Sequence, residues 1–121
     1  MTQNEYQKAA LSTCLDTCRN EVYGVNGLLA EVGEYADKIA KWARKGICRV
    51  DNNRLVFNTS DPAEVAMYRK ELAYELGDIK WFVALNAYLL GYSEEEVAQM
   101  NIAKLADRQK RGVIDGNGDH R

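Results

Sequence analysis

The sequence predicts an all-α fold in which four helices pack like a four-helix bundle. Apolar residues recur at the helical period in two long stretches, 27–45 and 70–91, and the period is lost between Ile47 and Ser60. At 121 residues and 46% hydrophobic content, the chain is long enough for one core. We therefore expect a single domain over residues 1–121.

The first two helices are expected in the N-terminal half. A weakly apolar face predicts a helix over about 4–18. The second helix begins within the breaker-rich window 20–27 and runs to Lys45, because Gly46 is a typical C-terminal stop. In the segment 47–60, two apolar triplets flank an Asp-Asn-Asn turn, which predicts a short β-hairpin or an extended loop.

Local start signals define the last two helices. The pair Asp61-Pro62 provides a capping residue and a first helical position, and this helix is expected to stop at Gly91. Ser93 followed by three glutamates forms a capping box that opens a fourth helix to roughly Lys110. The tail, residues 112–121, contains three glycines and few apolar anchors, so the sequence predicts that it is flexible.

Composition and charge limit which partners and which cellular compartment are expected. A net charge of −2 and a pI near 5.4 argue against binding to nucleic-acid polymers, which depends on clustered lysine and arginine. No apolar run reaches the length of a membrane span, and the N-terminus lacks a signal-peptide pattern. We expect a cytoplasmic protein without a membrane partner.

The cysteines and the histidine provide little support for a disulfide, a metal site or a catalytic base. Three cysteines are an odd number, so a disulfide framework is not expected. Cys14 and Cys18 lie four residues apart, which suits either a metal or redox pair or two small buried hydrophobic side chains. The second interpretation is favoured because no further cysteine or histidine lies nearby. His120 is next to the last residue and is a poor candidate for a general base.

Two pairs of carboxylates accompany the apolar stripes of the long helices. Glu31 and Glu34 lie at the edge of the first stripe, while Glu75 falls inside the second and Asp78 at its edge. An ionised carboxylate is costly to bury unless it is paired or binds a metal, so a shared divalent cation is predicted. Ordinary surface ion pairs, such as Glu34 with Lys38, are the alternative. Each acid pair also encloses a glycine, Gly33 or Gly77, which predicts that the helices approach closely there.

Basic residues follow the same surfaces. Three lysines share the side of Glu34 on the second helix, and three basic residues follow one side of the fourth helix into the tail. A metal site beside cations suits a polyphosphate substrate, whereas a solvated charged face is the alternative. The absence of a glycine-rich phosphate loop excludes a P-loop enzyme, and the absence of helical histidines argues against a di-iron bundle. These basic residues are Lys38, Lys41, Lys45, Lys104, Arg108 and Arg111.

The acidic motifs resemble those of a known family. Gly27-Leu28-Leu29-Ala30-Glu31-Val32-Gly33-Glu34 followed by Glu75-Leu76-Gly77-Asp78 is similar to the paired ExxE and ExxD motifs of MazG-like nucleotide pyrophosphohydrolases, within the all-α NTP pyrophosphatase superfamily. The resemblance continues through 91–98, 101–105 and the tail. One departure is that 40 residues separate Glu34 from Glu75, more than is usual in the family, with the excess most simply placed in the segment 47–60.

The resemblance implies a reaction and a set of roles. The substrate would be a nucleoside triphosphate, in particular a deoxynucleotide, cleaved between the α and β phosphates to the monophosphate and pyrophosphate in nucleotide-pool clean-up. Glu31, Glu34, Glu75 and Asp78 would hold two or more Mg²⁺ ions, or Mn²⁺ in their place. Glu34 would lie nearest the attacking water, with Glu31 beside it as the second catalytic carboxylate. The substrate-binding residues would be Lys38, Lys41, Lys45, Asn101, Lys104, Arg108 and Arg111. A homodimer or homotetramer is implied, with the site near the subunit interface.

Other interpretations stay open at this point. The chain could be a non-catalytic helical module that binds a partner or a nucleotide, or a dedicated dUTP or phosphoribosyl-ATP hydrolase of the same superfamily. Asn86 is either a buried amide satisfied by a neighbouring helix or a contact to the base. Trp42, Trp81 and Phe82 could stack on a base, although aromatic residues at helical spacing usually belong to a core.

Overall fold

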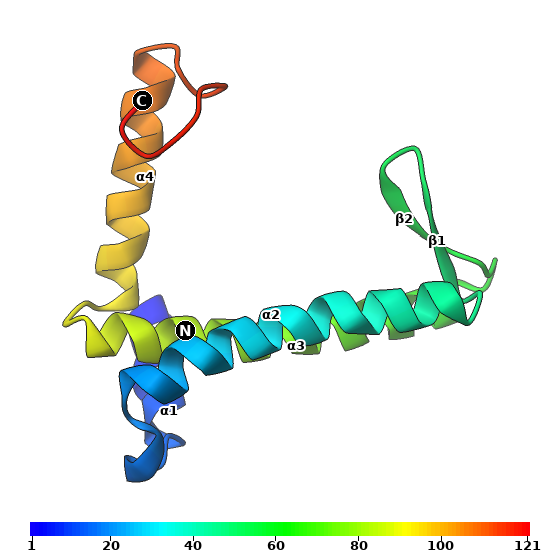
Figure 1. The fold of residues 1–121 in the computed structure, drawn as a ribbon, viewed down its shortest axis with the longest axis horizontal. Helices are drawn as coiled ribbons and strands as arrows, with labels where there is room; N and C mark the ends of the chain where they lie inside the picture. The colour runs from blue at the N-terminus through cyan, green and yellow to red at the C-terminus, as the bar shows by residue number, and fades with distance from the viewer.

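The computed structural model describes all residues from Met1 to Arg121 and confirms the all-α class (Figure 1). One antiparallel β-hairpin separates the second and third of four helices, as the first of the two alternatives for this segment predicts. The expected first helix is shorter than predicted, because it ends at Ser12 and a separate 3₁₀ turn follows it. The elements are α1 (Gln3–Ser12), the 3₁₀ turn (Asp16–Cys18), α2 (Glu21–Arg44), β1 (Cys48–Asp51), β2 (Arg54–Phe57), α3 (Pro62–Leu89) and α4 (Glu94–Lys110).

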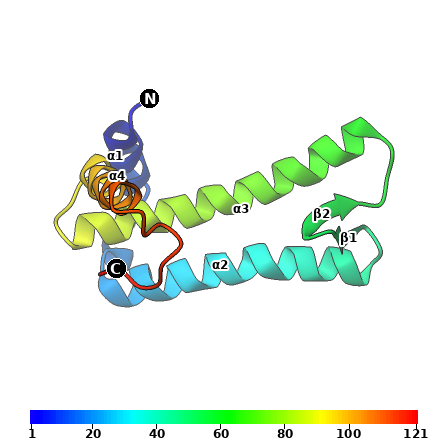
Figure 2. The ribbon, with the colours of Figure 1, turned by 90° about the horizontal axis from the view of Figure 1, so that it is seen from above.

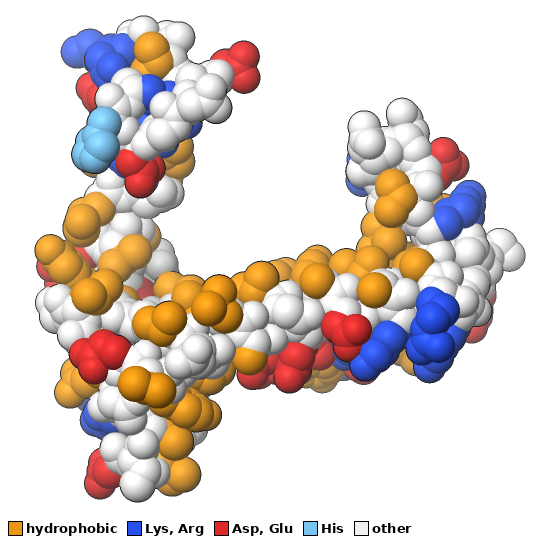
Figure 3. Space-filling view, in the orientation of Figure 1, with side chains coloured by type: hydrophobic (Ala, Val, Ile, Leu, Met, Phe, Trp, Pro, Cys, Tyr) orange, Lys and Arg blue, Asp and Glu red, His pale blue; other side chains and the backbone are white.

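The helices α2 and α3 form a long antiparallel pair that dominates the shape. They contain 24 and 28 residues, and the hairpin stands at one end of the pair while α1 and α4 cross it at the other (Figures 1 and 2). The hairpin and α4 rise on the same side. Figure 3 shows apolar side chains on the surface between them and acidic side chains along the opposite edge of the pair. None of the helices has the length and apolarity that crossing a bilayer requires.

Side-chain caps fix where the long helices begin. The side chain of Asn20 accepts a hydrogen bond from the backbone N–H of Tyr23 at the start of α2. Asp61 caps α3 ahead of Pro62, and Ser93 forms a reciprocal capping box at the start of α4, as the sequence predicts. These caps satisfy backbone donors that have no partner within the helix, so the elements start where the local sequence dictates.

Two small apolar clusters hold the helix pair at its ends. Cys14 and Phe82 belong to the cluster near α1, and Cys48, Phe57 and Leu72 form the cluster under the hairpin. Only 13 of 121 residues are buried, so neither cluster is a large core. Cys14 is buried and Cys18 packs against the same cluster, so both side chains contribute to apolar packing there.

An aromatic cluster, made of Trp42, Phe57 and Tyr68, fills the space between α2 and α3 at the hairpin end. The rings of Phe57 and Tyr68 are stacked with centroids 5.2 Å apart, and Trp42 meets Tyr68 edge-on at 5.1 Å. The two helices diverge toward this end (Figure 2). Aromatic side chains bury large areas, so these three rings contribute much of the packing between the helices at this end.

The prediction that Gly33 and Gly77 allow a close helix approach is wrong. A Cβ atom at either position would meet nothing within 4 Å. The close approach instead involves Gly24 and Gly27 near α1, where Cβ atoms would lie 3.0 Å from the Oδ1 atom of Asn86 and 2.0 Å from the Cε1 atom of Phe82. The helices are closest at this end of the pair and diverge beyond it, so only the early glycines of α2 are enclosed.

The tail, for which the sequence predicts flexibility, turns back along α4. The guanidinium of Arg108 donates hydrogen bonds to the carbonyl oxygens of Gly118 and Asp119 and to the Asp119 carboxylate. Lys104 lies 3.1 Å from the same carboxylate. Gly118 has a positive φ of 79°, a left-handed conformation that glycine adopts easily. Two cations of α4 are therefore engaged by residues of the tail.

Candidate functional site

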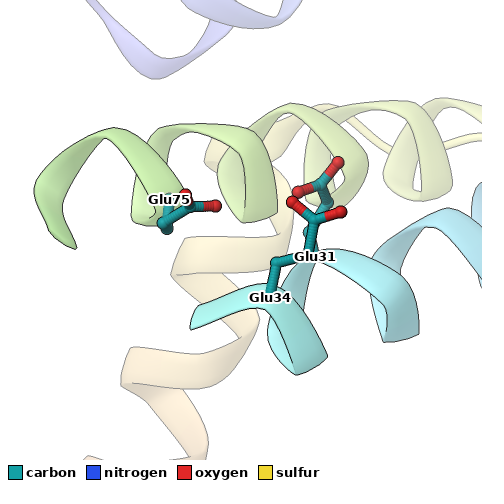
Figure 4. A group of neighbouring side chains, drawn as sticks. All are labelled: Glu31, Glu34 and Glu75. Atoms are coloured by element: carbon teal, nitrogen blue, oxygen red, sulfur yellow. The ribbon is translucent and has the colours of Figure 1, made fainter. Parts of the chain in front are cut away.

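Three carboxylates converge at the middle of the helix pair. One oxygen each of Glu31, Glu34 and Glu75 lies within 4.8 Å of the others. We call these three residues the acid cluster. Glu31 and Glu34 project from neighbouring positions one turn apart on α2, and Glu75 reaches toward them from α3 (Figure 4). The sequence spacing therefore brings these side chains to one place between the helices.

The acid cluster contains carboxylate oxygens that no protein group satisfies. Glu31 Oε2 and Glu75 Oε2 are buried and have no hydrogen-bond partner. Burial raises the pKa of Glu31, and the negative charges of Glu34, Asp78 and Glu75 raise this pKa further. Such an arrangement is unfavourable for the chain alone, because buried polar atoms are normally paired.

Asp78 lies beside the acid cluster rather than inside it. Its side chain is exposed on α3, one turn beyond Glu75. With Glu31 it lines a pocket of about 260 Å³, whose other walls are the aromatic rings of Tyr23, Trp81 and Phe82. The influence of its charge on Glu31 agrees with this proximity. A fourth carboxylate is thus available at the edge of the same site.

The acid cluster fits a hard divalent cation. All of its donors are carboxylate oxygens, the ligands that Mg²⁺ and Mn²⁺ prefer, and it contains no thiol or imidazole that would favour softer ions. The two unpaired buried oxygens provide free coordination positions. Acidic side chains are common on helices, but a divalent cation would compensate both the crowded charge and the missing partners.

Lys38 of α2 forms an ion pair with the acid cluster across the two helices. Its ammonium nitrogen lies 2.8 Å from Glu75 Oε1 and 3.5 Å from Glu71 Oε2, and the hydrogen bond to Glu75 is the main cause of its raised pKa. The ion pair therefore crosses between helices, whereas the sequence suggested a pair with Glu34 on the same helix. Glu71 is absent from the predicted site. Its position one turn before Glu75 is the signal that could have indicated it.

A cationic trough opens next to the acid cluster. It has a volume of about 390 Å³, and its lysines lie on successive turns of α2. Lys41 is paired with Asp37 at 2.7 Å, while Lys45 forms no ion pair. Figure 3 shows basic side chains beside the acidic ones along this edge of the pair. The residues that line the trough are Glu34, Asp37, Lys38, Lys41, Trp42, Lys45 and Glu75.

The predicted substrate-binding residues of α4 lie elsewhere in the single chain. The helix packs on α1 and α3 at the end of the pair and points away from the acid cluster (Figure 1). Asn101 is exposed, Lys104 and Arg108 contact Asp119, and Arg111 is paired with Asp107 at 2.8 Å. The structure does not bring these four residues to the lysines of α2, and their role in substrate binding stays a prediction.

Asn86 and the aromatic residues near it have structural partners. The Asn86 amide donates hydrogen bonds of 2.9 Å to the carbonyl of Gly24 and 2.8 Å to that of Phe82. The ring nitrogen of Trp81 donates to Thr13, and Phe82 is buried. Of the two interpretations of Asn86, the helix-bridging amide is the one that these contacts support. Phe82 is part of the core, which leaves Trp42 as an aromatic residue that lines the cationic trough.

Comparisons with known proteins identify the family. The family model described as MazG nucleotide pyrophosphohydrolase domain matches residues 23–113, a range that contains the acid cluster, Asp78 and the trough. The Gene 37 protein of Mycobacterium phage L5 is 34% identical over 125 residues, and the alignment covers 96% of each chain. No solved structure matches the chain significantly. The extent of the family match and the full-length relative show that the chain belongs to the MazG nucleotide pyrophosphohydrolase family.

Proposed function

We propose that this chain hydrolyses nucleoside triphosphates, including deoxynucleotides, between the α and β phosphates, releasing the monophosphate and pyrophosphate. The observation that carries the proposal is the acid cluster, with two buried unpaired oxygens, next to a trough lined by three lysines. Membership of the family supports the same reaction class. Such an activity would remove unwanted nucleotides from the cellular pool.

Four carboxylates would hold the metal. Glu31, Glu34 and Glu75 provide the inner oxygens, and Asp78 provides a further one at the edge of the site. Mg²⁺ is the proposed cation, with Mn²⁺ as a substitute, because both prefer oxygen ligands. When bound, a divalent cation supplies Lewis-acid polarisation of the phosphoryl oxygens and lowers the pKa of water.

The lysines of the trough would bind the leaving group. Lys38, Lys41 and Lys45 project from α2 into one concave surface beside Glu34 and Glu75. Ammonium groups attract phosphate oxygens strongly, and the charge that develops on departing pyrophosphate is greatest in the transition state. The triphosphate would therefore lie along α2, with its β and γ phosphates toward Lys45 and its α phosphate at the acid cluster.

Glu34 is the proposed proton acceptor. It is the exposed member of the acid cluster, so it can reach a water molecule that enters from solvent. In the proposed step, the water oxygen forms a bond to the α phosphorus while the bond from that phosphorus to the bridging oxygen breaks. The bridging oxygen leaves with pyrophosphate, and the proton of the attacking water passes to the Glu34 carboxylate. Glu31, beside it, would be one of the carboxylates that hold the cation.

We also propose that the protein acts as a homodimer or homotetramer. Large apolar side chains are exposed along the three longer helices, among them Leu29 (65%), Leu76 (53%) and Ile102 (65%). A chain with so few buried residues gains stability by covering such a surface with a second copy. In such an assembly, Asn101, Lys104, Arg108 and Arg111 would act on a nucleotide held by a neighbouring copy. Sedimentation velocity at micromolar concentration should show a dimer or tetramer, and a stable monomer would contradict this part.

The deciding experiment is pyrophosphate release from a panel of NTPs and dNTPs with Mg²⁺, with Mn²⁺ and with EDTA. Metal-dependent formation of monophosphate plus pyrophosphate is expected, and Glu34→Gln should lose at least about a hundredfold in rate. The exposed Glu21, in the first turn of α2 and outside the site, provides the control Glu21→Gln. If only nucleotides with one particular base are hydrolysed, the chain is a dedicated enzyme such as a dUTP hydrolase. If no nucleotide is cleaved with either metal, a non-catalytic binding module becomes the better interpretation.

A further inference from the structure

Lys38 is the one cationic side chain that forms an ion pair with the acid cluster. Its ammonium nitrogen lies 2.8 Å from Glu75 Oε1, and every other ion pair of the chain involves residues outside the cluster. The contact is shielded, because the side chains of Lys38 and Glu75 are 26% and 13% exposed. The positive charge that a crowded acidic site requires is thus supplied in part by a residue of the chain itself.

This ion pair occupies a carboxylate that a metal would need. Glu75 Oε1 is bound to Lys38, while Glu75 Oε2 is buried and has no hydrogen-bond partner. A divalent cation bound to Glu75 would lie close to the ammonium group. Like charges at such a distance repel where water is partly excluded, so a cation bound to Glu75 disfavours the ammonium group at its present position.

The ammonium group of Lys38 has a second position available, in the cationic trough. Its side chain also lines the cationic trough, in which Lys41 and Lys45 lie further along the same face of α2. A lysine side chain is flexible and carries its charge on a long stem, so rotation moves the ammonium group without moving the helix. Away from Glu75, the ammonium group would face whatever anion fills the trough.

We propose that Lys38 is the resident counter-ion of Glu75, that it leaves this carboxylate when a divalent cation binds, and that it then holds a phosphate of the substrate. The inference rests on the proposed function and adds a coupling to it. Metal binding releases the lysine that the triphosphate requires, and the triphosphate stabilises the released position. Each ligand should therefore increase the affinity of the other, since such coupling is reciprocal.

The test is a calorimetric titration of Mn²⁺ alone into the wild type and lysine variants, with no nucleotide present. Lys38→Met removes the competing charge, so its Mn²⁺ affinity should rise on the order of tenfold. Lys38→Arg keeps a cation at the position and should stay near the wild-type affinity. Lys38→Gln serves as a second neutral variant should Lys38→Met fold poorly, which circular dichroism would show.

Lys41→Met provides the matched control for charge alone. Lys41 lines the same trough on the same helix but is paired with Asp37 instead of the acid cluster. Its removal should change Mn²⁺ affinity by less than about threefold, because a charge without direct contact is screened. The proposed contact of Lys38 with phosphate is tested by titrating inorganic tripolyphosphate at saturating Mn²⁺. The affinity for tripolyphosphate should fall in Lys38→Met.

The outcomes separate the two proposals. Tighter Mn²⁺ binding together with weaker tripolyphosphate binding in Lys38→Met supports the exchange. Equal or weaker Mn²⁺ binding in both neutral variants would mean that Lys38 holds Glu75 in place for the metal, and the inference would be overturned while hydrolysis by the wild type stands. Unchanged tripolyphosphate affinity would overturn the transfer to phosphate. A wild type that binds no Mn²⁺ would overturn the metal site and the exchange together.

Discussion

The ring of Phe82 occupies the space that any side chain at Gly27 would need. A Cβ atom at position 27 would lie 2.0 Å from Cε1 and 2.2 Å from Cζ of this ring. The ring cannot yield easily, because it packs against Trp81 with centroids 4.9 Å apart and against Tyr23 at 5.4 Å. Glycine at this position therefore sets how closely α2 and α3 approach near α1.

Replacing this glycine should destabilise the protein. Overpacking by Gly27→Ala is expected to cost about 1–3 kcal/mol, since the aromatic neighbours must shift. Gly33→Ala on the same helix is the control, because its Cβ would meet open space and should stabilise α2 by about 0.5–1 kcal/mol. Urea denaturation of both variants measures the difference. Equal midpoints would mean that the two helices are not held together at Phe82.

Glu31 should oppose folding when no metal is present. Its carboxylate is partly buried, has an unpaired oxygen and lies among other negative charges. Glu31→Gln should therefore raise the melting temperature in EDTA by a few degrees while it weakens metal binding. Glu34→Gln should have a smaller effect because Glu34 is exposed. Differential scanning calorimetry in EDTA measures the melting temperatures of both variants. A lower value for Glu31→Gln than for the wild type would show that the carboxylate is needed structurally.

Acid should detach the tail from α4. Hydrogen bonds from Lys104 and Arg108, together with their charges, hold the pKa of Asp119 below its ordinary value of 3.8. A carboxyl group with a lowered pKa stabilises the docked tail above about pH 3.8, and this stabilisation is lost as the pH falls through the lowered pKa. Amide NMR shifts of Gly118 between pH 2 and 6 would follow the release.

The variant Asp119→Asn should release the tail already at neutral pH. Asp115, which lies in the same segment and forms no ion pair, provides the control Asp115→Asn. The Gly118 amide should shift in the first variant and stay unchanged in the second. If both variants keep the docked position, the carbonyl contacts of Arg108 are sufficient to hold the tail.

Phe57 should be important for the hairpin end of the molecule. It is 9% exposed and packs against both Trp42 and Tyr68. Phe57→Ala should cost about 3–5 kcal/mol, or less if the neighbouring rings collapse into the space. Val50→Ala is the control, since Val50 is 72% exposed and should change stability by less than about 0.5 kcal/mol. Urea denaturation with near-ultraviolet circular dichroism, which follows the Trp42 environment, would measure both.

The sequence predicts those features that local chemistry determines. Asp61-Pro62 and Ser93 start their helices as expected, because capping depends on residues three or fewer positions away. The acid cluster was predictable because helical spacing places Glu31 and Glu34 on one side and because a buried carboxylate requires a partner. The early end of α1 was not evident, since its weakly apolar face continues in sequence beyond Ser12.

Features that depend on how two helices pack could not be predicted from the local sequence. The pairing of Lys38 with Glu75 depends on how far α2 is displaced along α3, and neither helix contains this information alone. The divergence of the pair likewise decides that Gly27, and not Gly33, is enclosed. The contact of Arg108 with the tail depends on a reversal of the chain at glycines whose direction the sequence does not specify.

The aromatic cluster also suggests an order of folding. Trp42 and Tyr68 are joined by a short segment of chain, whereas Gly27 and Phe82 are separated by a much longer one. Because the entropy lost on closing a loop grows with its length, the contacts under the hairpin can form before those near α1. The helices would then associate progressively from the hairpin toward α1. Glu31 and Asp78 lie well along this path, so mutually repelling carboxylates meet only after apolar contacts are in place to hold them.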